Sequence, residues 1–148
     1  MSNYPEWWNT TITIFNKYED TLTRQITWFK HVVDGVFWKD VSDKVEFGGA
    51  TLETNKIICR VREDASFKEK YLWVQEPNDK KADYFTLGQG DIIVKYSVDD
   101  NINEYDEGHR STDIIAKYKA LQGCMEVDKV SVNVGGGRNN PHYRVEGI

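Results

Sequence analysis

Residues 11–18 read Thr-Ile-Thr-Ile-Phe-Asn-Lys-Tyr, and they give the clearest sign of the fold class. Apolar residues alternate with polar ones around Ile12 and Ile14, and β-branched and aromatic side chains fill most of the stretch. Alternation with a period of two predicts a β-strand that buries one face. We therefore expect a β-rich protein, and we extend the search for strands outward from this one.

Similar patterns recur along most of the chain. Polar residues at 19–21 predict a turn, and Asp34-Gly35 predicts a tight turn between two further strands. Residues 42–55 contain two adjacent glycines and scattered charges without a sustained period, so we expect a loop there. Besides residues 11–18, strands are predicted at residues 24–33, 36–41, 56–62, 71–74, 91–98, 126–134 and 142–145.

One segment predicts an α-helix. Ile114 and Tyr118 lie on one apolar stripe at helical spacing, and Gly123 follows the expected end. The helix is expected near residues 112–122. About 6–8 short strands with one short helix favour a mainly β fold, either a β-barrel or a β-sandwich with the helix packed on it.

The length and charge of the chain limit the number of domains and the kinds of protein that it can be. The 148 residues carry 24 acidic and 19 basic side chains, for a net charge of -5. This length fits one domain, and we expect an N-terminal arm at residues 1–10 followed by a single β-rich domain at 11–148. No apolar run approaches the roughly 20 residues that a membrane-spanning helix needs, and no secretion signal is evident. The acidic balance disfavours a broad nucleic-acid-binding surface.

Tryptophan is abundant and unevenly placed. Trp7 and Trp8 precede the first strand, where one small domain has difficulty burying them. We hypothesise that Tyr4, Trp7 and Trp8 form an interface with a neighbouring subunit, because exposed aromatic patches mark such contacts. The other three tryptophans lie in strand patterns and are expected in the core: Trp28, Trp38 and Trp73.

An acidic segment follows the strand predicted at 91–98. Carboxylates on one loop are the ligands that calcium prefers, but the spacing here departs from the calcium-loop pattern. Glu104 stands where that pattern has glycine, and Arg110 stands where it has a bidentate glutamate. No metal site is predicted, and we expect a solvated loop that is mobile or faces DNA, formed by Asp99, Asp100, Glu104, Asp106 and Glu107.

A second candidate loop is the run Gly135-Gly136-Gly137-Arg138. Bare backbone amides can hold a phosphate, but neither a Lys-Ser or Lys-Thr pair nor a helix follows this run. We therefore expect the tip of a hairpin, and we group it with the acidic segment as a mobile or DNA-facing loop.

Catalytic signals are weak. A nucleophilic pair formed by Cys59 or Cys124 with His109 depends on the fold, and nothing near either cysteine indicates an activated thiolate. A small cysteine- or metal-dependent hydrolase remains an alternative only if these cysteine and histidine side chains cluster in space. The three histidines lack the spacing of a zinc site: His31, His109 and His142. We predict neither catalytic residues nor a cofactor, and we do not expect an enzyme.

Five segments carry a resemblance to a known group of proteins. They are Ile-Thr-Ile-Phe-Asn-Lys-Tyr at 12–18, WFKHVVDGVFWKD at 28–40, FTLGQGDIIVKY at 85–96, the helix at 113–121 and Pro-His-Tyr-Arg-Val at 141–145. In these segments the chain resembles small head-to-tail connector and minor capsid proteins, of the head-completion or stopper type. Such proteins come from tailed bacteriophages and prophages of Gram-positive bacteria.

This resemblance implies a virion structural protein that assembles in the cytoplasm of the bacterial host. It implies a β-barrel subunit of a homo-oligomeric ring below the portal, where the ring helps to retain or pass DNA. The implied partners are other connector or portal proteins, with neither a membrane nor sequence-specific nucleic-acid binding. Stopper, adaptor and tail-end roles stay open. The alternative is a non-catalytic carbohydrate- or protein-binding β-module that uses exposed tryptophans.

Overall fold

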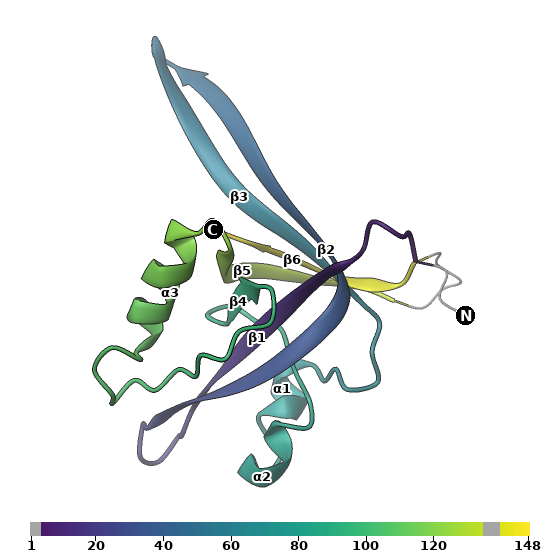
Figure 1. Cartoon of the computed structure of the whole chain (residues 1–148), viewed down its shortest axis with the longest axis vertical. Helices are drawn as coiled ribbons and strands as arrows, with labels where there is room; N and C mark the ends of the chain where they lie inside the picture. The colour runs from purple at the N-terminus through teal and green to yellow at the C-terminus, as the bar shows by residue number, and fades with distance from the viewer. Residues whose placement is uncertain (1–3, 135–139) are drawn as a thin grey trace.

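A computed structural model describes residues 4–134 and 140–148 and shows antiparallel strands that close into a barrel (Figure 1). The strands are β1 (Thr10–Glu19), β2 (Ile26–Phe47), β3 (Ala50–Arg62), β4 (Ile92–Lys95), β5 (Cys124–Asn133) and β6 (His142–Gly147). Their order around the barrel is β1-β2-β3-β6-β5-β4, and β4 pairs back with β1. The predicted mainly β fold is confirmed, and it is the barrel rather than the sandwich.

The alternation in β1 places its side chains in two layers. Ile12 and Ile14 are fully buried in the core cluster inside the barrel, together with residues of every other strand. Phe15 belongs to a second cluster on the outer side of the barrel. Both faces of β1 are therefore buried over part of its length, which explains why apolar residues stand at adjacent positions there.

The predicted helix covers that second cluster. Helix α3 (Ser111–Ala120) buries Ile114 against Ile92 and Val94 of β4. The helix ends at Ala120, two residues before the predicted end, and the left-handed φ of +58° falls on Gln122. The amide of Gly123 donates a hydrogen bond to the carbonyl of Tyr118 at 2.9 Å. Strand β4 is thus buried on both faces, with the barrel on one side and α3 on the other.

Two predicted strands are one strand in the structure. The turn expected at Asp34-Gly35 is absent, and β2 continues through both residues. The pairing of β1 with β2 shifts register between Thr10 and Ile12, and Gly35 adopts a φ of +69°. A β-bulge uses the same turn-prone residues to add a kink without ending the strand.

The loop expected at residues 42–55 is a β-hairpin. Strands β2 and β3 pair without a register shift from Phe37 opposite Arg60 to Phe47 opposite Ala50. Gly48 and Gly49 join them with φ values of +58° and +84°, as a type I′ hairpin turn requires. The pairing of β2 with β1 ends at Val36, and the pairing of β3 with β6 ends at Ile57. Beyond these residues the far half of the hairpin extends outside the barrel (Figure 1). We call residues 41–56 the ribbon.

The strand expected at 71–74 is the short helix α1 (Lys70–Trp73), which is followed by α2 (Asn78–Lys81). Trp73 is fully buried, with its ring 5.5 Å from that of Phe29. The Trp73 indole is buried against the barrel wall, and the backbone of residues 70–73 has no neighbouring strand to pair with. Both conditions favour the helical turn. The strand expected at 91–98 ends at Lys95, because Tyr96 has a φ of +78°. Residues 4–134 and 140–148 therefore contain six strands.

Within the described residues, no helix is long and apolar enough to cross a membrane.

Candidate functional site

The β2–β3 hairpin packs on the barrel core at its base. There Trp38 lies opposite Cys59, and both pack on the core. Asp40 and Ile57 are the next pair on that face. Further along, every second pair of the register joins two residues that are polar in sequence: Ser42 with Asn55, Lys44 with Glu53, and Glu46 with Thr51.

Apolar residues are paired near the tip of the ribbon. The register has no shift, and it pairs Val45 with Leu52 and Phe47 with Ala50.

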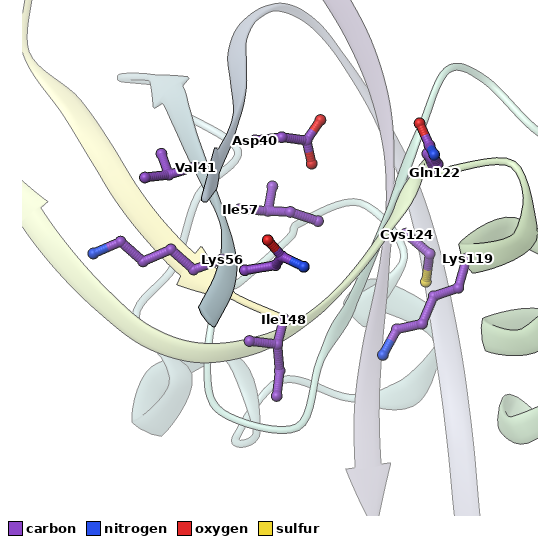
Figure 2. A pocket seen from close by; sticks show the side chains of 9 residues that line it. Asp40, Val41, Lys56, Ile57, Lys119, Gln122, Cys124 and Ile148 are labelled. Atoms are coloured by element: carbon purple, nitrogen blue, oxygen red, sulfur yellow. The ribbon is translucent and has the colours of Figure 1, made fainter. Parts of the chain in front are cut away.

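A pocket of about 520 Å³ lies at the base of the ribbon. Figure 2 shows the base of the ribbon on one side of it and the segment after α3 on the other. The lining residues come from β2, β3, the C-terminal end of α3 with the segment that follows it, β5 and the C-terminal residue: Asp40, Val41, Asn55, Lys56, Ile57, Lys119, Gln122, Cys124 and Ile148. The pocket combines apolar side chains with two ammonium groups and one carboxylate.

The chemistry of this pocket favours binding rather than reaction. Burial raises the pKa of the Cys124 thiol to about 11, so the thiol stays protonated at neutral pH. Lys119 forms an ion pair with Glu126 at 2.8 Å. Ile148 is 64% exposed at the rim and offers an uncovered apolar contact. These groups suit the docking of a partner side chain or peptide segment.

The N-terminal residues fold onto their own barrel. Trp8 is 5% exposed, and its ring packs edge-on against His142 at 5.7 Å. The carbonyl of Trp8 accepts a hydrogen bond from Nη2 of Arg62 at 3.0 Å, and the hydroxyl of Tyr4 donates to the carbonyl of Pro141. The expectation that both tryptophans escape burial is therefore wrong for Trp8, whereas Trp7 is 67% exposed.

The other tryptophans divide between the core and its edge. Trp73 is fully buried, as predicted. Trp28 and Trp38 are half-buried, with Trp38 packed against the barrel core. The indole N–H groups of both half-buried tryptophans are shielded from solvent without a hydrogen-bond partner.

The acidic segment is fastened to the molecule at several points. Asp100 accepts hydrogen bonds from the hydroxyl of Tyr118 at 2.6 Å and from Nζ of Lys117 at 2.9 Å. These two contacts lower the pKa of Asp100. Glu104 accepts a hydrogen bond from the amide of Ser111 at 2.6 Å. Two of the five acidic residues therefore hold the loop against α3, and the other three are exposed: Asp99, Asp106 and Glu107.

A depression of about 480 Å³ lies beside this loop, lined by Asp99, Asp100, Asn101, Asn103, Asp106 and His109. His109 contacts Asp106 at 3.0 Å. In residues 4–134 and 140–148, no group of three His, Cys, Asp or Glu side chains has the arrangement of a metal site. The run Gly135-Gly136-Gly137-Arg138 lies outside the described residues.

Neither cysteine has the surroundings of an activated nucleophile. Cys59 and Cys124 are free, buried thiols, and burial raises the pKa of each. This shift is opposite to the one that activates a cysteine nucleophile. His31 packs against the ring of Phe85 at 5.0 Å, whereas His109 is exposed.

Sequence reasoning missed the ribbon and the pocket at its base. A signal existed, because Phe47 with Ala50 and Val45 with Leu52 are placed symmetrically about Gly48-Gly49. Such symmetry about two glycines is typical of a hairpin. The pocket left no signal of this kind, since its residues come from distant segments.

Comparison with known proteins gives one match. The model of a family of unknown function, DUF6751, matches residues 7–148. Neither a curated protein nor a solved structure matches the chain.

Proposed function

The chain belongs to the DUF6751 family, and we propose that it is a structural subunit of a bacteriophage virion, a head-tail connector protein of the head-completion or stopper type. In this role the chain assembles into a homo-oligomeric ring and acts through its surfaces, with other connector or portal proteins as partners. No activity follows from membership of this family, because the function of the family is unknown. The support is the resemblance of five segments together with the shape of the barrel.

The observation that carries the proposal is the ribbon. A two-stranded ribbon is at best marginally stable in water, and open strand edges are normally covered or paired. Here the outer edges of residues 41–47 and 50–56 pair with no further strand among the described residues. A subunit that is completed by its neighbours in an assembly accounts for these open edges.

The charge of the chain agrees with a DNA conduit. The net charge of -5 makes the chain repel a DNA backbone on average. Because tight DNA binding depends on lysine and arginine contacts to phosphate, an acidic ring lets DNA pass instead of holding it.

The binding-module alternative has less support. The glycan platform considered from the sequence needs several exposed and coplanar tryptophan rings. Trp7 is 67% exposed, whereas the other four tryptophans are buried or half-buried: Trp8, Trp28, Trp38 and Trp73. A single exposed indole does not form such a platform.

Removal of the gene from the phage or prophage that carries it tests the proposal. Particles made without the protein are expected to accumulate as heads and tails that are not joined, visible by electron microscopy. Adding the purified protein to these extracts should restore joined, infectious particles. Mass spectrometry of purified wild-type particles should detect the chain. Joined and infectious particles formed without the protein would overturn the proposal.

A further inference from the structure

We propose that a basic outer face of the barrel in one copy docks on the acidic segment between β4 and α3 of a second copy, so that the copies are joined head to tail. This inference rests on the proposed function for its setting, and it specifies the contact that would build the ring. The acidic segment is residues 99–110, and the basic outer face consists of Lys39, Lys56, Arg60, Lys129 and Arg144.

The alternation of side chains along the strands places these five cations on the outside of the barrel. In β3, Cys59 and Val61 are fully buried in the core, so Arg60 between them points outward. Each of the other four cations adjoins a residue that packs on the core: Lys39 follows Trp38, Lys56 precedes Ile57, Lys129 precedes Val130, and Arg144 precedes Val145. Since β2, β3, β6 and β5 are neighbours in this order, the five side chains share one wall.

The charge of this face is opposite to that of the chain as a whole, which is -5. Its five cations are accompanied by two carboxylates, Glu146 on the same face and Asp128 in the bulge beside Lys129. Arg144 is ion-paired with Glu146. Within residues 4–134 and 140–148, the other four cations form no ion pair, so they are open to the carboxylates of a partner: Lys39, Lys56, Arg60 and Lys129.

The acidic segment lies on the opposite side of the barrel. Lys30, on the outer face of β2, donates from Nζ to the carbonyls of residues 98–100 at 3.3–3.4 Å, and Ile102 packs with Phe15 of β1. In the strand order, β1, β2 and β3 separate the β1–β4 seam from the β3–β6 seam on one side, and β4, β5 and β6 separate them on the other. The acidic segment therefore cannot cover the basic outer face of its own chain.

The acidic segment has the charge and shape to receive cationic side chains. It carries five carboxylates against the single guanidinium of Arg110. The depression of about 480 Å³ in this segment is lined by three of these carboxylates and by two asparagine side chains. Lys117 and Tyr118 engage Asp100, whereas Asp99 and Glu107 form no ion pair within the described ranges. Carboxylate and amide oxygens accept hydrogen bonds from lysine and arginine.

This complementarity selects the symmetry of the assembly. A twofold contact pairs a surface with itself, which would place like charges together. A contact between two different surfaces on opposite sides of a subunit leaves one of each free at the two ends, and it closes into a ring when the rotation per subunit allows. Duplex DNA is another polyanion that a basic face attracts, but the net charge of -5 opposes its approach.

Light scattering coupled to size exclusion, measured over a range of concentrations, tests the contact with two charge-reversal variants. Lys39→Glu with Lys129→Glu alters the basic outer face, and Asp99→Lys with Asp106→Lys alters the acidic segment. All four side chains are exposed. The control is Asp79→Lys with Asp83→Lys, which makes the same change of charge at exposed positions in and after α2. Circular dichroism of each variant shows whether the barrel is intact.

The wild-type chain is expected to exceed the 17.2 kDa of one subunit as concentration rises. Association should weaken as salt increases from about 50 mM to about 500 mM, because salt screens exposed charges. Each charge-reversal variant should associate at least about tenfold more weakly, while the control assembles like the wild type. A mixture of the two variants should reach at least the mass of two subunits at concentrations where each alone is monomeric, because an intact face then meets an intact segment.

Four results would overturn the inference. Three are assembly of either charge-reversal variant at wild-type strength, a mixture that stays monomeric, and a wild-type chain that stays monomeric at every concentration. The fourth is binding of a labelled DNA duplex by the wild type that is lost in the Lys39→Glu and Lys129→Glu variant, while the assembly of that variant is unchanged. In each case the particle experiment above still decides the proposed function, because joining of heads to tails does not require this particular contact.

Discussion

The ammonium group of Lys70 lies 3.0 Å from Oδ1 of Asp91, whose side chain has no solvent exposure. The same carboxylate accepts hydrogen bonds from the amide of Lys17 at 2.9 Å and from Nδ2 of Asn16 at 3.1 Å. Asn16 also donates to the carbonyl of Thr86 and accepts from its amide. One buried carboxylate thus ties β1 to α1 and to the turn that precedes β4.

Replacing Asp91 with Asn is expected to lower the free energy of unfolding by about 1–3 kcal/mol. The amide oxygen of Asp91→Asn can still accept the hydrogen bonds from Lys17 and Lys70 that reach Oδ1. Its NH₂ group would face the NH₂ group of Asn16, so that two donors meet without an acceptor. Urea denaturation at pH 7 measures the change. An unchanged midpoint would show that the carboxylate does not organise this part of the barrel.

The effect of Asp91 on stability should depend on pH. Burial raises the pKa of Asp91 in spite of the opposing effect of Lys70. As pH rises from about 4 through the folded-state pKa, the unfolded chain releases this proton first, so the contribution of Asp91 falls. The stability difference between wild type and Asp91→Asn should therefore be largest at low pH and shrink as pH increases. A difference that grows with pH would contradict the argument.

Asp100 should show the opposite dependence. The hydroxyl of Tyr118 and the ammonium of Lys117 lower its pKa, so its contribution is present above pH 4 and is lost as pH falls through the folded-state pKa. Asp100→Asn should cost about 1 kcal/mol at pH 7 and little at low pH, as measured by thermal unfolding. Asp99→Asn, at the exposed neighbouring position, is the control and should change stability little at either pH.

Trp8 and Trp7 form a matched pair of adjacent tryptophans. Trp8→Ala removes a buried ring that packs on His142 and Phe37, and it should cost about 3 kcal/mol. Trp7→Ala removes a ring that is 67% exposed and should change stability by less than about 0.5 kcal/mol. Chemical denaturation of both variants measures the contrast. Equal effects would mean that the N-terminal segment does not pack on its own barrel.

At Gly147, strand β6 lies tightly against β5. A Cβ atom at Gly147 would lie 2.1 Å from the carbonyl oxygen of Glu126 and 2.4 Å from Cγ of Met125. Because backbone atoms cannot move aside cheaply, Gly147→Ala should cost about 3 kcal/mol or more. The control is Gly88→Ala, where the nearest atom, Cδ of Lys70, would lie 3.4 Å away. Melting temperatures of the two variants should therefore differ clearly.

The ribbon should be dispensable for folding of the barrel. Replacing residues 43–54 with an Asn-Gly turn removes pairs that lie beyond the ends of β1 and β6. The melting temperature should change by only a few degrees, on the order of the shift that 1 kcal/mol produces in a domain of this size. Loss of cooperative unfolding in the shortened chain would show instead that the ribbon belongs to the folding unit.

The barrel strands were predictable because burial leaves a periodic pattern. Residues 56–62 alternate between Ile57, Cys59 and Val61 on the core face and polar or outward residues, and β3 pairs there on both sides. The helix at 111–120 was predictable for the same reason, since one stripe of it packs on β4. Sequence periodicity therefore predicts a strand or helix where one of its faces packs on the core.

The ribbon and α1 were not predictable in this way. Residues 42–55 pair only with each other, beyond the ends of β1 and β6, so no barrel core imposes a period on their sequence. Residues 71–74 have a strand-like composition, but the packing of Trp73 on the barrel decides their conformation. Gly35 was misread because a turn and a bulge use the same residue type.

Strands β2 and β3 enter the ribbon without a joint. Neither glycine nor proline occurs between Val36 and Phe47 or between Ala50 and Arg62. The two paired backbones of the ribbon therefore continue unbroken into the barrel. A displacement of the hairpin turn would be transmitted through both backbones to β2 and β3 in the barrel wall.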